Sequence, residues 1–281
     1  MWLFYSLLSG GLYTAESLLQ RFHLRKQKDV WTFALFYSLI GAIVTFPFAV
    51  ASPKIPTHIT TWLLVFLVGI LIVANNMLFF KATSLVEISV VNSLQKLRLV
   101  WIFSLSILLL HDSFSWPELL GTILVICAGW IILHSFKRPE SARGIWLVLI
   151  LSLVNGGIII LFKYLLSSFN SVSLTFFADY LPATLLTALV APKAATRIKD
   201  IFKDDWRVIF LACSLGAFSN LALNAALSLH DASGVLVMNE AFLILVLVGE
   251  HIFLKEREKT WIKAATVALA IAGAVLIDLS H

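Results

Sequence analysis

The 281-residue chain is 60% hydrophobic and only 13% charged. Soluble domains carry about 25% charged residues, so this composition excludes a protein that folds mainly in water. The formal net charge of +5 does not indicate a nucleic-acid partner, because basic loops beside a membrane face anionic lipid headgroups. The sequence therefore predicts an integral membrane protein.

A membrane-spanning helix needs roughly 20 mostly apolar residues. Ten such stretches follow one another, at residues 2–22, 31–51, 60–81, 88–110, 116–135, 144–166, 171–191, 206–228, 232–253 and 260–279. The first stretch has neither a basic leader nor a small-residue cleavage pattern, so we expect it to be a span and not a removed signal peptide. The connections are mostly shorter than about 10 residues. Function must therefore lie among the helices.

The chain contains an internal repeat, because residues 62–133 align without a gap with residues 206–277. The identical pairs are Trp62 and Trp206, Phe66 and Phe210, Asn76 and Asn220, Ala82 and Ala226, Ser84 and Ser228, Ser89 and Ser233, Thr122 and Thr266, and Gly129 and Gly273. A weaker match of Thr32, Phe33 and Tyr37 with Thr175, Phe176 and Tyr180 extends each copy to five spans.

Copies with an odd number of spans lie inverted relative to each other in the bilayer. We therefore predict an all-α integral membrane fold with ten transmembrane helices, built as two inverted five-helix repeats at residues 1–136 and 144–281. Inverted repeats of this kind build secondary transporters, whose substrate site lies at the shared midplane.

Basic residues predict the orientation. Loops after odd-numbered spans contain nearly all the loop lysines and arginines, whereas loops after even-numbered spans contain only Lys54. The positive-inside rule places the first set in the cytoplasm and both termini outside, in a multi-pass protein of the plasma (inner) membrane. Cys127 and Cys213 lie mid-span in apolar sequence, so we expect no disulfide, no metal site and no cofactor.

Several short motifs resemble those of a known family. They are Gly144 with Lys163 in the second half, Leu254-Lys255-Glu256-Arg257 followed by Gly273, and His111-Asp112 followed by Gly121 and Gly129. Together with the duplication they resemble the EamA-type branch of the drug/metabolite transporter superfamily over nearly the whole chain.

This resemblance implies a ten-helix carrier that alternates between inward-open and outward-open states, with spans five and ten at the periphery. Such carriers move amino acids, nucleotide sugars, purines, quaternary amines and other small metabolites, often as exporters, so the fold leaves the cargo open. Many relatives keep their termini in the cytoplasm, whereas the lysine and arginine distribution here indicates the reverse.

Ionisable residues within the spans are the strongest functional candidates, because a charge at mid-bilayer costs about 2.5 to 3.5 kcal/mol on insertion scales. Lys96, Arg98, Asp179 and Glu240 fall within roughly 5 Å of their helix centres, and Glu16 within about 6 Å of its own. Lys163 lies nearer a helix end, where its side chain can reach the interface.

The repeat register aligns Lys96 with Glu240. Lys96 continues a polar stripe with Asn92 one turn earlier, and Ser233 precedes Glu240 on one helix face. We predict that Lys96 and Glu240 contact the carboxylate and the amine of a zwitterionic substrate. The alternative is a static ion pair that only holds two helices together.

Arg98 points away from Lys96, since two residues turn a helix by about 200°. Asp179 and Glu16 are the carboxylates available to pair with it, and one carboxylate then has no cation. We expect this to be Glu16, which makes protons the candidate coupling ion, because burial disfavours a charged carboxyl. A neutral acid that only hydrogen-bonds its neighbours is the alternative.

Amides and aromatic residues complete the predicted substrate site. The amides are Asn75 and Asn76 in span three and Asn220 and Asn224 in span eight, and the aromatic candidates are Tyr13 and Trp101, with Phe79 and Phe80. Hydrogen bonds between helices explain such asparagines equally well, and aromatic residues in spans more often pack or face lipid.

Two helix-breaking features lie inside predicted spans. Pro182 lies inside span seven and Gly156-Gly157 inside span six, and either could kink its helix or allow close packing.

The predicted function is secondary active transport of a small zwitterion such as an amino acid, with export as the expected direction. Transport of a quaternary amine or a nucleobase-type metabolite is the alternative substrate class, and a passive channel or other non-enzymatic membrane protein is the alternative kind of protein. An enzyme is not expected, because no metal or nucleophile motif is present. The sequence leaves the oligomeric state open.

Overall fold

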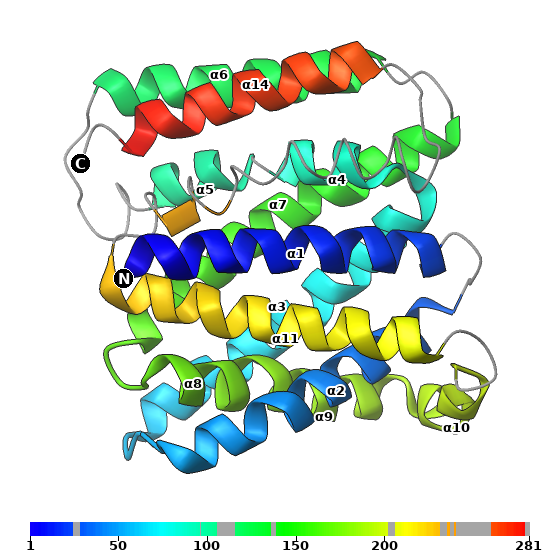
Figure 1. Ribbon diagram of the computed structural model, residues 1–281, viewed down its shortest axis with the longest axis vertical. Helices are drawn as coiled ribbons and strands as arrows, with labels where there is room; N and C mark the ends of the chain where they lie inside the picture. The colour runs from blue at the N-terminus through cyan, green and yellow to red at the C-terminus, as the bar shows by residue number, and fades with distance from the viewer. Residues whose placement is uncertain are drawn as a thin grey trace.

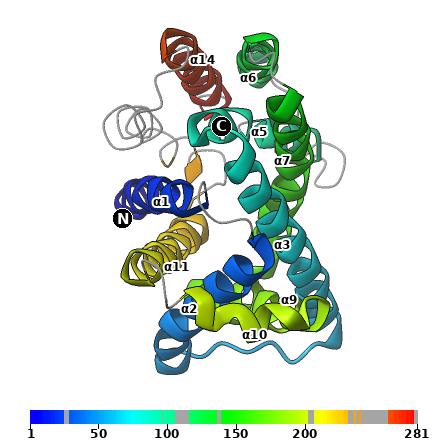
Figure 2. The same cartoon turned by 90° about the vertical axis from the view of Figure 1, so that its right-hand side faces the viewer.

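The computed structural model describes residues 1–24, 29–95, 97–105, 116–135, 139–201, 206–230, 235–236, 239 and 260–278. Within these residues every regular element is a helix. The long helices lie roughly side by side, with their connections at two opposite ends of the bundle (Figure 1), and Figure 2 turns the bundle by 90°. Lys96, Glu240, most of the predicted span 232–253, and the turns at His111-Asp112 and 254–257 lie outside the described residues.

The elements follow the predicted spans closely. They are α1 (Trp2–Leu24), α2 (Val30–Ala51), α3 (Ile59–Leu85), α4 (Ile88–Gln95), α5 (Arg98–Leu105), α6 (Trp116–Ser135), α7 (Pro139–Leu165), α8 (Ser171–Leu174), the π-helix η2 (Thr175–Tyr180), α9 (Leu181–Val190), α10 (Pro192–Ile201), α11 (Trp206–Leu229) and α14 (Thr260–Asp278). In this part of the chain, five helical segments are long and apolar enough to cross a membrane. An integral membrane protein made of helices is therefore confirmed.

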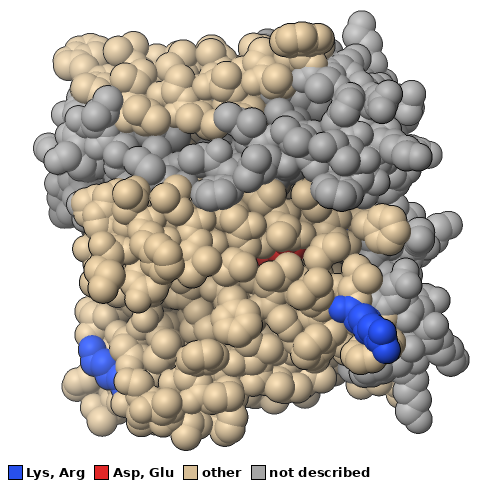
Figure 3. Space-filling view, viewed as in Figure 1, with Lys and Arg blue, Asp and Glu red and all other residues tan. Residues whose placement is uncertain are grey.

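The outer surface suits lipid and not water. Large apolar side chains are widely exposed, among them Leu63 at 63%, Trp146 at 67% and Leu189 at 75%. Figure 3 shows a broad face that is almost uncharged, with basic groups toward its two edges and a small recessed acidic patch. Apolar patches of this extent are rare on water-soluble monomers, whereas a hydrocarbon solvent requires them.

Helices of the two predicted repeats pack on each other across a long seam. In chain order the packed pairs are α1 with α11, α2 with η2 and α9, α3 with α7, and α6 with α14. The last pair lies at one edge of the bundle (Figures 1 and 2), as the family resemblance implies for spans five and ten. Tyr37 and Tyr180, which align in the sequence repeat, meet at the seam with their hydroxyl groups 3.5 Å apart.

The predicted span 88–110 is not one continuous helix. Its described part divides into α4, which ends at Gln95, and α5, which begins at Arg98. The Leu97 N–H bonds the Leu94 carbonyl at 3.1 Å, three residues back and not four. This tighter turn breaks the α-helical ladder next to Arg98.

Span seven is also irregular, next to Pro182, where the sequence predicts a possible kink. Residues Thr175–Tyr180 form a π-helix, in which the Leu181 N–H bonds the Phe176 carbonyl. The ring of Pro182 would clash with the carbonyl of Ala178 in a regular α-helix. The wider π turn accommodates that ring, and the same turn contains Asp179.

The Gly156-Gly157 pair does not break α7, which runs from Pro139 to Leu165. A Cβ on Gly156 would lie 3.1 Å from the Trp101 Cβ and 3.4 Å from the Arg98 carbonyl oxygen, whereas one on Gly157 would meet nothing within 4 Å. Gly156 therefore permits close packing of α7 on α5.

A short polar helix, α10, was not predicted from the sequence. It packs on α2 and α9, and Arg197 at its centre donates a hydrogen bond of 3.0 Å to Asp29. Asp29 is also the N-cap of α2, since it accepts from the Thr32 N–H at 3.2 Å and the Thr32 hydroxyl at 2.7 Å. One carboxylate thus caps one helix and anchors another.

Asp29→Ala should destabilise the protein by about 1 kcal/mol, because it removes the cap, and should lower the apparent Tm by about 2–4 °C. Asp29→Asn keeps a capping oxygen and should cost clearly less. Thermal unfolding in detergent measures both, and equal losses in the two variants would contradict a capping role.

The carboxyl group of Asp29 also makes the stability of the folded protein depend on pH. Burial raises the pKa of Asp29, but hydrogen bonds from Thr32 and Arg197 lower it more, so the folded-state pKa lies below the ordinary value of 3.8. Its stabilising contribution is therefore complete above the unfolded-state pKa and is lost as the pH falls through the folded-state pKa. The difference in Tm between wild type and Asp29→Ala should shrink over that acidic range.

Candidate functional site

A cavity of about 160 Å³ lies at the seam between the repeats. This volume holds on the order of ten water molecules. From the first repeat it is lined by Ser9, Tyr13, Glu16, Gln20, Tyr37, Ile72, Asn75, Asn76, Phe79, Phe80, Gln95 and Arg98, and from the second by Asn155, Ile158, Ile159, Phe162, Asp179, Ser219, Asn220, Leu223, Asn224, Leu227 and Asn239. The lining combines polar groups with aromatic rings.

Glu16 forms the α1 side of the cavity. Its side chain is only 4% exposed, and one carboxyl oxygen accepts from the Gln20 amide at 2.7 Å. It lies directly against Gly216 of α11, where a Cβ would come within 2.6 Å of the Glu16 Cδ and 2.7 Å of the Tyr37 hydroxyl. Only a glycine leaves room for this carboxyl between α1 and α11.

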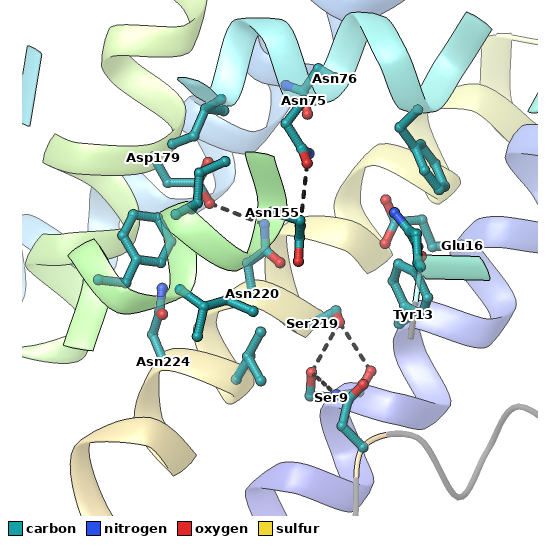
Figure 4. A pocket seen from close by; sticks show the side chains of 18 of the residues that line it. Ser9, Tyr13, Glu16, Asn75, Asn76, Asn155, Asp179, Ser219, Asn220 and Asn224 are labelled. Atoms are coloured by element: carbon teal, nitrogen blue, oxygen red, sulfur yellow. Dashed lines mark hydrogen bonds between the residues drawn. The ribbon is translucent and has the colours of Figure 1, made fainter. Parts of the chain in front are cut away.

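Asp179 forms the opposite side, as Figure 4 shows. The π-helix carries it, and it is 7% exposed. The Asn220 amide donates to the carboxylate at 3.1 Å and to the Tyr180 hydroxyl at 2.9 Å. Asn224, one turn along α11, donates to the Thr175 hydroxyl at 2.9 Å. Both asparagines thus bind the π-helix while they line the cavity, and their contact with a substrate stays a prediction.

Arg98 occupies a third wall, at the start of α5. Its guanidinium donates to the Asn155 side-chain oxygen at 3.0 Å, and the Asn155 amide donates to the Asn75 oxygen at 3.2 Å. This chain links three helices, α5, α7 and α3. The two amides fix the direction of the guanidinium.

Serine and amide groups close the cavity toward the N-terminal end of α1. Ser9 and Ser219 lie 3.2 Å apart, and the Asn239 amide donates to Ser9 at 2.8 Å (Figure 4). Farther out, Trp2 stacks on His230 with ring centroids 4.1 Å apart. The Lys163 ammonium donates to the carbonyls of Leu227 and His230 at 3.1 and 3.0 Å, so it caps α11 at the end of the bundle.

The structure brings most of the predicted site residues together. Ten line the cavity, namely Tyr13, Glu16, Asn75, Asn76, Phe79, Phe80, Arg98, Asp179, Asn220 and Asn224. Asn92 is buried behind them and accepts from the Tyr13 hydroxyl at 3.1 Å. Trp101 is not in the lining; it is 38% exposed and donates to Ser152 at 3.2 Å. Lys96 and Glu240 lie outside the described residues, so their predicted roles stay predictions.

The polar lining residues that the sequence does not predict as site residues include Ser9, Asn155, Ser219 and Asn239. Asn155 could have been found, because an amide in the middle of a span is costly unless it is hydrogen-bonded. The two serines carry no such signal, since serine in a span commonly bonds its own helix backbone.

Comparison with known proteins identifies the family. The sequence matches the EamA-like transporter family over residues 1–134 and 142–278. The chain belongs to the EamA-like transporter family. The resemblance inferred from the duplication and the short motifs is therefore confirmed, and an EamA-like protein is a membrane transporter of the drug/metabolite superfamily and not an enzyme.

Solved structures share this fold. One crystal structure matches over 98% of this chain and 99% of the other, with a TM-score of 0.54 and 14% sequence identity. At that identity the likeness shows the fold alone. A comparison with curated proteins finds no significant match.

The cavity of this EamA-like protein can bind opposite charges at separate walls. Arg98 offers donors to an anionic group. Asp179 and Glu16 offer acceptors to a cationic group, and Phe79, Phe80 and Phe162 supply an apolar surface. Such a small set of oriented polar groups on an apolar wall is typical of sites for small molecules.

Gly216→Ala should lower stability, because the new methyl group displaces the Glu16 carboxyl and the Tyr37 hydroxyl. A loss of about 1–3 kcal/mol is expected for such overpacking. Gly157→Ala is the matched control: its methyl group meets open space, and alanine favours a helix by about 1 kcal/mol over glycine. Thermal unfolding should show a lower Tm for the first variant alone, and equal Tm values would contradict the close contact.

Proposed function

We propose that this protein is a secondary active transporter that moves a small zwitterionic metabolite, such as an amino acid, by alternating access around the seam cavity. The observation that carries the proposal is the arrangement of one basic and two acidic side chains around one cavity, with Arg98 on one wall and Asp179 and Glu16 on others, inside a bundle whose outer surface is apolar. Ionisable groups at such depth in a membrane bundle are costly and mark functional sites by default.

The substrate carboxylate would bind Arg98. Its guanidinium is already oriented by Asn155, which Asn75 orients in turn. A planar guanidinium binds a carboxylate through two parallel hydrogen bonds, and its preset direction reduces the entropy lost on binding.

The substrate amine would bind Asp179. Asn220 orients this carboxylate through one hydrogen bond, and a carboxylate has room for further donors. Lys96 and Glu240, which align in the repeat, would add a second pair of opposite charges. The inverted arrangement of the two repeats belongs to this proposal and is supported by the packed pairs of helices across the seam.

Glu16 is the proposed proton carrier. It is buried beside Gln20 and Gly216 on the helix pair α1 and α11, so its protonation state would change the packing of the two repeats. A proton gradient could then drive the cycle, with export as the proposed direction.

A quaternary amine is the second candidate substrate. The described lining holds two carboxyls but one guanidinium, and it adds five aromatic rings, from Tyr13, Tyr37, Phe79, Phe80 and Phe162. Aromatic faces and carboxylates together suit a bulky cation.

A thermal-shift screen of amino acids, quaternary amines and nucleobases against the purified protein should find a stabilising ligand, because a bound ligand stabilises in proportion to its occupancy. Arg98→Ala should weaken the binding of a zwitterion about tenfold or more, since it removes a charge-assisted hydrogen bond. Binding of a quaternary amine would be unaffected by Arg98→Ala and lost in Asp179→Asn. Ser228→Ala is the control, because Ser228 is exposed and bonds its own helix.

In proteoliposomes, Glu16→Gln should abolish transport driven by a pH gradient while substrate exchange without a gradient continues. Retention of full gradient-driven transport would contradict proton coupling through Glu16. Single-channel currents in the same membranes would contradict a carrier altogether.

A further inference from the structure

A second cavity lies far from the seam, beside the unpredicted helix α10. It has a volume of about 300 Å³ and shares no described lining residue with the seam cavity. Asp29 and Trp31 at the start of α2 form one side, and Val190, Lys193, Ala194 and Arg197 at the junction of α9 and α10 form the other.

The direction of α10 places this cavity at a membrane surface. The helix packs on α2 and α9 and is seen nearly end-on in Figure 1, at the end of the bundle opposite the N-terminus. It therefore crosses the direction of the spans. Its sequence, PKAATRIKDI, mixes apolar and basic residues, and Ala194 is buried while Lys193 is exposed. A polar, basic helix that lies across the ends of spans is typical of the interface between lipid and water.

The charge of this cavity favours an anion. Arg197 and Asp29 form an ion pair at 3.0 Å. Lys193 then gives the lining of this cavity one net positive charge. The Arg197 guanidinium is 58% exposed on its side chain and retains donors beyond the one that Asp29 accepts. Two basic groups one helical turn apart can thus reach the same anionic group.

The approach to the cavity is apolar. Leu185, Leu189 and Val190 of α9 are 56%, 75% and 64% exposed, and the first two lie one turn apart on one helix face. Trp31 is 39% exposed at the rim, and tryptophan is enriched where lipid meets water. An apolar track therefore leads along α9 to a basic pocket.

We propose that this pocket binds an anionic phospholipid, with an acyl chain along Leu185 and Leu189 and the headgroup phosphate at Lys193 and Arg197. The segment between α9 and α11 follows an odd-numbered predicted span, and the positive-inside rule predicts that such segments face the anionic cytoplasmic leaflet. The bound lipid would join α10 to the ends of α2 and α9. This inference does not depend on which metabolite the seam cavity binds.

Native mass spectrometry of the full-length protein tests the site, with phosphatidylglycerol and phosphatidylcholine of the same acyl chains as probes. The wild type should retain phosphatidylglycerol preferentially, and Lys193→Ala should weaken that retention about fivefold. Lys54→Ala is the control, because Lys54 lies in the loop between α2 and α3, away from α10, and bonds the Ser167 carbonyl. Equal retention of both lipids, or no effect of Lys193→Ala, would overturn the proposal.

Two further measurements separate a lipid from a soluble anion. Phosphatidylglycerol with brominated acyl chains should quench part of the tryptophan fluorescence, and Trp31→Phe should remove that part. Millimolar glycerol 1-phosphate should leave the bound lipid in place. Displacement of the lipid by glycerol 1-phosphate, or unchanged quenching in Trp31→Phe, would show that the acyl chain is not bound beside α9 and would overturn the lipid assignment.

Discussion

A hydrocarbon solvent offers no hydrogen bonds, so each polar group in this bundle must find its partner inside the protein. The chain meets this constraint by turning its deep carboxyls, guanidinium and amides toward one seam. There they hold helices together: Asn155 joins α7 of the second half to α3 and α5 of the first, and Asn220 and Asn224 join α11 to the π-helix within the second half. The groups that assemble the bundle are thus the same groups that line its cavity. Loss of one such cavity residue will therefore affect the stability of the bundle.

The backbone is irregular where the cavity needs it. The π-helix carries Asp179 and is followed by Pro182. The break between α4 and α5 stands beside Arg98, and Gly216 admits the Glu16 carboxyl between two helices. Each irregularity is less stable than a regular helix, because it weakens backbone hydrogen bonds or lowers the helix propensity. Their concentration around one cavity supports a functional origin.

Much of this architecture could be predicted from the sequence. Apolar stretches locate most spans, and the ungapped alignment of Asn76 with Asn220 points to one cavity-lining amide in each repeat. The break in span four was missed, because composition cannot show a backbone hydrogen bond that shifts from four residues to three. Ser9 and Ser219 were missed because serine is common in spans. Helix α10 was missed because its basic residues indicate a cytoplasmic loop equally well. Trp101 was expected in the site, yet its large ring faces outward and bonds Ser152.

The central claim is that the seam cavity is an aqueous substrate site reached in turn from each side of the membrane. Its most direct test is thiol labelling of Asn76→Cys in a protein that carries Cys127→Ser and Cys213→Ala, reconstituted in vesicles. The account predicts that a membrane-impermeant maleimide labels Cys at this position from either side, and that a transported ligand slows the reaction from both. Labelling by lipid-soluble reagents alone, or labelling that no ligand slows, would contradict it.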